Sequence, residues 1–351
     1  MEALIEQTLH YFTEIPIKYF ELMDTSRLDE SRYIVFITLQ NHEKVVLKLY
    51  SNSYTNLNHI EECANLAKLY HSHGIVTPLF LKSKKGKYGE FITYQNKYYY
   101  AWLEQWIESQ FQITLQEQQA SFIYDLGKLH GNMHRISKSH RLISENRTPW
   151  GLFDTYLIPE SDDENYTNAN WLYSELLNTE VNQSLLSEIW EIYQQKRNKL
   201  ECLYPLLPES MIQADLSPGN YIINEAGKIV GIYDYNCAGT DKLVSEFIQE
   251  AIFICFEAYD TEWFDNEHLI WMNSRFDTYL RGYVSEYHLS ELELRAANLL
   301  YDIVRPFRWD KVKITLDKFK QGYIGEVNKR LEWMLKELNQ DDSISKRIDI
   351  F

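Results

Sequence analysis

The stretch MIQADLSPGNYIINEAGKIVGIYDYN, residues 211–236, combines two aspartates and one asparagine with short apolar runs. It predicts a strand, a loop, and then a hairpin whose turn lies at Glu225–Gly227. Because the two ends of a hairpin lie side by side, the loop from Asp215 to Asn220 is expected beside Asp234. These hard oxygen ligands suit Mg²⁺ bound to nucleotide phosphates, and Asp215 is left to face an acceptor hydroxyl.

A hairpin of an unrelated fold, with the same three residues in turns, is the alternative interpretation. The upstream chain provides an independent test. Apolar runs at Tyr33–Leu39 and Lys44–Tyr50, with a polar turn between them, predict another hairpin. Lys48 lies inside the second run, where a lysine is normally a solvent-facing edge residue.

The region around Asp215 resembles the aminoglycoside phosphotransferase and choline kinase family, small-molecule kinases with the protein-kinase-like fold. The family loop H-G-D-x-x-x-x-N, followed by a hairpin and I-D-W, stands here as Gln213-Ala214-Asp215 to Asn220 and then Ile-Tyr-Asp234-Tyr. The resemblance implies Asp215 as catalytic base or hydroxyl-positioning carboxylate, Asn220 as a metal ligand and Asp234 as the principal Mg²⁺ ligand. A glutamine in place of the customary histidine can still donate a hydrogen bond to backbone, so we expect the loop to be preserved.

The resemblance also implies a nucleotide site upstream. Lys48 would hold the nucleotide phosphates and pair with Glu62, with Glu61 as fallback, on a helix expected at Asn58–His71. The loop that covers the phosphates falls at residues 24–32 and contains no glycine, so Ser26 and Ser31 are the candidate contacts. The acids of this loop oppose polyphosphate binding unless its arginines and the metal offset them.

Two further strands are predicted at Tyr88–Tyr94 and Lys97–Leu103, followed by a segment that resembles the family's hinge. In the family this hinge binds adenine through backbone groups, which by position implies Gln105 and Ile107. The predicted architecture is therefore α+β and bilobal. It comprises a nucleotide-binding lobe of antiparallel sheet and one major helix at residues 1–103, a hinge at 104–109, and a mainly helical catalytic and acceptor-binding lobe at 110–351.

Apolar periodicity predicts the helices of the second lobe. One covers Gln116–Ile136 and contains His134, to which we assign no chemistry. Glu246 stands where the family commonly has an aspartate that braces the catalytic loop. The helices that follow are expected at about 170–203, 243–258, 268–287, 289–303 and 311–338, with a polar tail from residue 339.

The net charge and composition limit the kinds of partner and acceptor that the protein can bind. A net charge of −16 argues against a nucleic-acid partner and favours a cationic or neutral acceptor. An acidic, aromatic-rich stretch from Glu257 to Glu267 is either part of an acceptor pocket or a solvated loop.

No apolar run approaches the length of a membrane span, and residues 1–12 predict an amphipathic helix, so we expect a cytoplasmic protein with no membrane partner. The four cysteines are scattered and are expected to be free thiols.

The sequence thus predicts transfer of the γ-phosphoryl group of ATP, or of GTP, with Mg²⁺, to a hydroxyl of a small molecule. An aminoglycoside, choline or a homoserine-like compound would each suit as acceptor. The alternative is a catalytically silent relative that serves as a binding or structural protein, as some spore-coat members of the family do. Gln213, Ala214 and the glycine-free loop favour the alternative, whereas the retained lysine, aspartates and asparagine favour the enzyme. Monomer and homodimer both remain open.

Overall fold

The computed structural model describes residues 1–27, 30–109, 119–153, 163–256, 266–340 and 343–349. The chain divides into two compact units. The first combines residues 1–111 with residues 218–238, and the second combines residues 112–217 with residues 239–351. The hairpin predicted from the opening stretch therefore belongs to the N-terminal unit, although it lies more than a hundred residues further along the chain.

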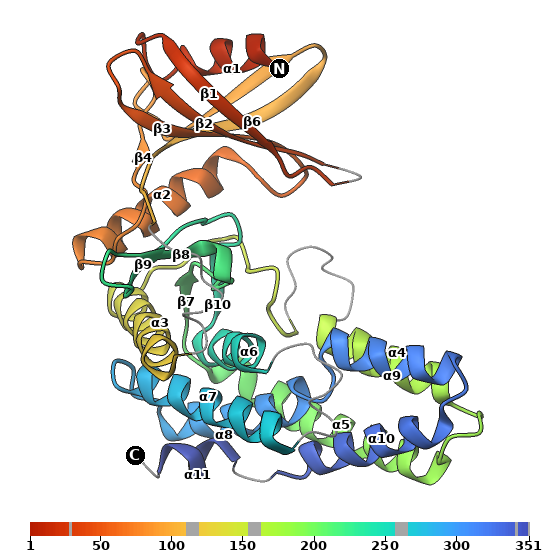
Figure 1. The fold of residues 1–351 in the computed structure, drawn as a ribbon. Helices are drawn as coiled ribbons and strands as arrows, with labels where there is room; N and C mark the ends of the chain where they lie inside the picture. Colours follow the sequence, from red (N-terminus) through yellow and green to blue (C-terminus); the bar gives the residue numbers. More distant parts are fainter. Residues whose placement is uncertain (28–29, 110–118, 154–162, 257–265, 341–342, 350–351) are drawn as a thin grey trace. The chain divides into compact units, whose positions relative to one another are not determined.

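The N-terminal unit is built on an antiparallel sheet, as predicted (Figure 1). Its strands follow the order β1 (Ile17–Asp24), β2 (Ser31–Leu39), β3 (Lys44–Ser51), β6 (Lys97–Gln105) and β4 (Phe80–Leu81), and β5 (Gly89–Tyr94) also pairs with β6. The pair β2–β3 confirms the predicted hairpin, and β5 and β6 confirm the two further predicted strands, which pair with each other. Strand β1 was not predicted, and it makes residues 25–30 the connection between β1 and β2.

Two helices accompany this sheet. Helix α1 (Glu2–Leu9) buries Leu4, Ile5 and Leu9 against sheet residues such as Val35 and Leu47. Helix α2 (Leu57–Ser72) confirms the predicted helix; its N-cap Asn56 accepts a hydrogen bond from the backbone N–H of His59 at 2.9 Å. Burial of one apolar stripe on each helix supplies most of the stabilisation of these elements.

The second hairpin consists of β8 (Tyr221–Ile223) and β9 (Ile229–Ile232), preceded by the 3₁₀ turn η3 (Pro218–Asn220). Backbone hydrogen bonds attach it to the rest of its unit through Val76. The N–H of Val76 donates to the carbonyl oxygen of Val230 at 2.9 Å, and the N–H of Ile232 donates to the carbonyl oxygen of Val76 at 3.0 Å. Gly231 lies between these bonds, and a Cβ atom there would stand 1.7 Å from the carbonyl oxygen of Val76. Only glycine permits this approach.

The second unit is mainly helical (Figure 1). It contains a two-stranded antiparallel sheet, β7 (Glu209–Ile212) with β10 (Gly239–Lys242). Its helices are α3 (Ala120–His140), α4 (Glu164–Leu176), α5 (Gln183–Leu203), the 3₁₀ turn η2 (Tyr204–Leu206), α6 (Leu243–Cys255), α7 (Asn266–Val284), α8 (Glu291–Val304), α9 (Trp309–Lys320), α10 (Ile324–Leu338) and α11 (Ser343–Ile348). Helix α3 packs along α7, and α6 packs on α8.

Several predicted boundaries differ from the structure. The region predicted as one helix at 170–203 is two helices, α4 and α5. The region predicted as helix at 311–338 is two helices, because Gly322 adopts a left-handed backbone conformation with φ of 81° and ends α9. The polar tail contains α11, where Ser343 and Ile344 are buried. Strand β6 extends to Gln105 and so includes the first two residues of the predicted hinge. Among the described residues, no helix is long and apolar enough to cross a membrane.

We predict that Gly231→Ala lowers the free energy of unfolding by at least about 2 kcal/mol, because the new methyl group would displace the Val76 backbone. The matched control is Gly325→Ala on α10, where a Cβ meets nothing within 4 Å and the change should stay below about 1 kcal/mol. Urea denaturation of both variants measures the difference. Equal effects of the two substitutions would contradict the packing described at Gly231.

Candidate functional site

Lys48 is a buried cation between two carboxylates of the N-terminal unit. It lies on β3, and its side chain is 6% exposed. The Nζ atom lies 3.2 Å from Oε1 of Glu104 on β6 and donates a hydrogen bond of 3.1 Å to Oδ1 of Asp234. Glu104 is itself held by the indole N–H of Trp102, at 2.7 Å. The predicted lysine and aspartate are therefore brought together although 186 residues separate them.

The charges of this cluster depend on one another. Burial lowers the pKa of Lys48, but the carboxylates of Asp234 and Glu104 outweigh that effect and raise it above its usual range. Burial raises the pKa of Glu104, and the ammonium group of Lys48 partly offsets this. Lys48 is consequently protonated at neutral pH. A permanently charged ammonium on a buried strand is suited to bind phosphate oxygens.

Asp234 is held at the end of the second hairpin in a left-handed conformation, with φ of 52°. Its Oδ1 also accepts the backbone N–H of Asn236 at 3.2 Å, and its side chain remains 29% exposed. The carbonyl of Asn220 accepts the N–H of Tyr233 at 2.7 Å, so Asn220 is tied to the residue just before Asp234. The two predicted metal ligands are thus neighbours on one hairpin, as the spacing indicated.

The segment after Asp234 is fastened to helix α2 and its neighbours. His59 Nε2 lies 2.8 Å from the carbonyl oxygen of Ala238, and the Cys63 thiol donates to the carbonyl of Tyr235 at 3.3 Å. Asn236 donates to the hydroxyl of Tyr50 at 2.7 Å, and Tyr50 lies two residues beyond Lys48 on β3. These contacts fix the aspartate relative to the lysine-bearing strand.

Among the described contacts, Lys48 does not pair with Glu62, the glutamate on α2 that the resemblance implied. The ion pairs of Lys48 are with Glu104 and Asp234, whereas Glu62 accepts a hydrogen bond from Asn58 at 3.3 Å. Glu61 accepts the backbone N–H of Tyr88 at 2.7 Å. The sequence placed Glu104 in the hinge and so did not identify it as a partner of Lys48. The available signal was a charged residue near the end of a strand that is apolar from Tyr98 to Leu103.

The predicted phosphate-covering loop connects β1 to β2, and its residues 28 and 29 lie outside the described residues. Ser26 is exposed there, and its hydroxyl accepts the N–H of Arg32 at 3.0 Å. Ser31, in contrast, is the first residue of β2 and is buried, where Lys97 donates to its hydroxyl. Ser26 therefore has the position expected of a loop contact, whereas Ser31 belongs to the sheet.

The hinge candidates both use backbone groups in contacts within their unit. The N–H of Gln105 donates to the carbonyl of Leu79 at 2.9 Å. The carbonyl of Ile107 accepts the hydroxyl of Tyr233 at 2.6 Å. Their predicted role in adenine binding stays a prediction. The hinge is nevertheless linked through Tyr233 to the hairpin that carries Asp234.

The Asp215 loop follows β7 in the helical unit, and Gln213 shapes it. The Gln213 side chain is fully buried; it donates to the carbonyl of Asp215 at 3.0 Å and accepts the Asp215 N–H at 2.9 Å. This confirms that glutamine can hold the loop backbone. Ala214 adopts a φ of 62°, a conformation that favours glycine, and Trp150 donates to its carbonyl at 2.9 Å. The Ser217 N–H donates to Oδ1 of Asp215 at 3.2 Å.

Glu250 on α6 is a second carboxyl group near this loop that the sequence did not indicate. The backbone N–H of Leu216 donates to it. Burial raises the pKa of Glu250 well above its usual range, and the neighbouring carboxylates of Glu246 and Asp215 raise it further. The acidic stretch predicted as part of an acceptor pocket lies outside the described residues at positions 257–265.

We predict that Glu104→Gln lowers the free energy of unfolding by about 3 kcal/mol, because it leaves the buried Lys48 with one carboxylate instead of two. Glu62→Gln is the matched control and should cost less than about 1 kcal/mol. Urea denaturation at pH 7 compares them. If Glu62→Gln is the more costly substitution, the glutamate on α2 rather than that on β6 stabilises the lysine.

The whole chain is similar to solved structures of small-molecule kinases. An amicoumacin kinase, solved in complex with AMP-PNP, Ca²⁺ and Ami, shares 13% identity at a TM-score of 0.59, with 97% of this chain and 96% of that chain covered. A microcompartment-associated aminopropanol kinase shares 12% identity at a TM-score of 0.61, with coverage of 98% and 99%. An aminoglycoside phosphotransferase from Alicyclobacillus acidocaldarius shares 9% identity at a TM-score of 0.53, with coverage of 100% and 97%. These likenesses confirm the predicted fold.

No curated protein matches the sequence significantly. The family model described as the phosphotransferase enzyme family, however, matches residues 27–289. That range contains β2, β3, the hinge, the Asp215 loop and the hairpin with Asp234, which are the elements on which the predicted resemblance depended. The chain therefore belongs to the phosphotransferase enzyme family.

Proposed function

We propose that the protein is a small-molecule kinase that transfers the γ-phosphoryl group of ATP to a hydroxyl group of its acceptor. The observation that carries the proposal is Lys48, a buried ammonium held by Glu104 and Asp234. A structural role alone would not require one lysine to join two strands of the sheet to the end of a distant hairpin. Family membership supports the same chemistry.

The residues of the hairpin fit a nucleotide-bound Mg²⁺ ion. Asp234 offers a carboxylate that is 29% exposed, so it can accept a ligand without unfolding its surroundings. The asparagine at position 220 offers an amide oxygen on the same hairpin, and both are the hard donors that Mg²⁺ prefers. When bound, the ion would neutralise charge on the phosphates. Lys48 would bind phosphate oxygens directly, which requires it to exchange its present contact with Asp234 for the nucleotide.

On the acceptor side, we assign Asp215 as the base or the hydroxyl-positioning carboxylate. The Gln213 side chain binds both the N–H and the carbonyl oxygen of Asp215, and the N–H of Ser217 donates to one carboxylate oxygen of Asp215. A fixed carboxylate orients a hydroxyl for attack at low entropic cost. Phosphoryl transfer depends mainly on such positioning and on charge neutralisation.

We infer that the acceptor carries both a hydroxyl and an amino group. The three similar structures are named for amicoumacin, aminopropanol and aminoglycosides. The net charge of −16 favours the approach of a cation over that of an anion. Aminoglycosides, choline and homoserine-like compounds all remain within this class, and GTP is the alternative donor. A panel of hydroxylated amines, assayed for acceptor-dependent ADP or GDP release, identifies the acceptor.

We predict that ATP with Mg²⁺ stabilises the protein against thermal unfolding, by about 2.7 kcal/mol at a hundred times Kd. Asp215→Ala should retain this shift and lose acceptor-dependent turnover, because Asp215 acts on the acceptor rather than on the nucleotide. Asp317→Ala, which removes an exposed acid on α9, serves as the control and should retain both.

Two results would contradict this assignment. Substantial residual turnover in Asp215→Ala would remove that residue from the mechanism. The absence of a thermal shift at millimolar ATP or GTP, with Mg²⁺ present, would favour a catalytically silent relative that retains the fold without the nucleotide site.

A further inference from the structure

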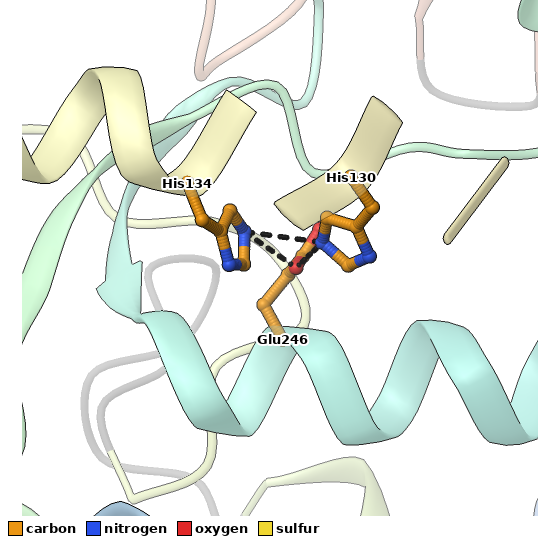
Figure 2. Close-up of side chains that lie close together, drawn as sticks. All are labelled: His130, His134 and Glu246. Carbon is orange, nitrogen blue, oxygen red and sulfur yellow. Dashed lines mark hydrogen bonds and ion pairs between the residues drawn. The ribbon is translucent and has the colours of Figure 1, made fainter. Parts of the chain in front are cut away.

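A second cluster of metal-ligating side chains lies inside the helical unit, separate from the residues assigned to phosphoryl transfer. It comprises His130 and His134, one turn apart on α3, and Glu246 on α6. Figure 2 shows the two rings and the carboxylate turned toward one another. Their side chains are 0%, 1% and 3% exposed, respectively. Three ionisable groups shut away from water at one point require a charge balance among themselves.

The three facing atoms form a compact triangle. Glu246 Oε2 lies 2.5 Å from Nε2 of His130 and 3.0 Å from Nε2 of His134, and the two nitrogens lie 3.1 Å apart. Zinc bound at about 2.0–2.1 Å in tetrahedral geometry sets its ligands roughly 3.3 Å apart. Two edges of the triangle are within a few tenths of an ångström of that spacing, and the third needs a small rotation of the carboxylate.

The outer nitrogen of each ring has a dedicated partner. His130 Nδ1 lies 2.7 Å from the hydroxyl of Tyr279, and His134 Nδ1 lies 2.8 Å from the hydroxyl of Tyr283, both on α7. Metal-bound histidines characteristically donate the other ring N–H to such an oxygen, which fixes the ring and its tautomer. If each Nδ1 carries the hydrogen, both Nε2 lone pairs face Glu246 and are available to a cation.

Glycines on α3 and α7 allow the two helices to pack closely enough for the tyrosine hydroxyls to reach the histidine rings. A Cβ atom at Gly127 or Gly131 of α3 would lie 2.2 Å or 2.4 Å from the backbone carbonyl oxygen of Tyr279 or Tyr283. Gly282 on α7 is equally close to α3, at 2.1 Å from the carbonyl oxygen of Tyr124. The close packing of the two helices therefore sets the tyrosine hydroxyls against the histidine rings.

The surroundings of the cluster are rich in buried acids. Glu246 raises the pKa of Asp241 and of Glu250, in addition to the larger effect of burial on both groups. A divalent ion at the triangle would lower the pKa values of both groups, because it would attract their charged forms. The donor set of two imidazoles and one carboxylate selects zinc and similar transition metals over Mg²⁺ and Ca²⁺.

We propose that His130, His134 and Glu246 bind one transition-metal ion of the zinc class, which joins α3 to α6 in the helical unit. The fourth coordination position would go to the second oxygen of Glu246 or to water. The competing arrangement is a metal-free hydrogen-bonded triad, in which both Nε2 atoms carry hydrogens toward Glu246 and both tyrosines donate to Nδ1. The two arrangements differ in metal content, which makes the proposal testable without any activity assay.

The test uses the chain of 351 residues without a histidine tag, produced with zinc and passed through metal-free buffer. Elemental analysis should give about one zinc per chain. Removal of zinc with a chelator should lower the melting temperature, and added Zn²⁺ should restore it. Added Co²⁺ in place of zinc should give the visible absorption of a four-coordinate site. His134→Gln should abolish metal binding, whereas the exposed-histidine control His71→Gln on α2 should retain it.

The proposal is overturned if the wild-type chain contains no zinc above the buffer level and shows neither a Co²⁺ spectrum nor a thermal response to Zn²⁺. That result would establish the hydrogen-bonded triad. Metal retention in His134→Gln would also overturn it, by placing the ion elsewhere. Because the wild-type measurements alone distinguish the two arrangements, poor folding of the variant does not obscure the outcome. None of these readouts depends on kinase activity.

Discussion

The pairing of Lys48 with Glu104 and Asp234 is the interaction on which the N-terminal unit depends. A lysine on a buried strand is costly unless carboxylates balance it, and here they come from β6 and from the end of the second hairpin. The pairing requires the hairpin to pack on the rest of the N-terminal unit, which Gly231 and Val76 make possible through backbone contact. The same geometry leaves one carboxylate, that of Asp234, partly open to solvent. The electrostatic balance of the cluster and the proposed binding of a metal-bound phosphate would therefore depend on the same three residues.

The helical unit reaches its loop geometry by an unusual combination of residues. Gln213 makes reciprocal hydrogen bonds with the backbone of Asp215, and so provides the support that the family ordinarily obtains from histidine. Ala214 occupies a left-handed conformation without the freedom of glycine, at a cost of about 1 kcal/mol. The Gln213 side chain donates one hydrogen bond to the loop backbone and accepts another, and Trp150 donates a third; together they offset that cost. Gln213 and Ala214 thus change how the loop is held, but the loop backbone around Asp215 is still supported by hydrogen bonds.

The sequence predicted those features that local patterns determine. Apolar runs located β2, β3 and the second hairpin, and the spacing from Asp215 to Asp234 indicated that the hairpin would bring the two proposed metal ligands, Asn220 and Asp234, together. Glu104 could not be paired with Lys48 in advance, because that pairing depends on the register of β3 against β6, set by residues about fifty positions apart. The histidine cluster could not be predicted for a related reason. Its Glu246 comes from a helix that only the folded chain brings alongside α3. Strand β1 and the end of α9 at Gly322, in contrast, did have local signals in the sequence.

The most direct test of the central claim is the Mg²⁺ dependence of ATP affinity, measured by isothermal titration calorimetry on the wild-type protein and on Asp234→Asn. If Asp234 binds the nucleotide's metal, Mg²⁺ should tighten ATP binding to the wild type by about tenfold or more, equivalent to about 1.4 kcal/mol. In a folded Asp234→Asn protein this enhancement should disappear, while Asp317→Asn should retain it. Full Mg²⁺ enhancement in Asp234→Asn would contradict the assignment of Asp234 and, with it, the role given to the Lys48 cluster.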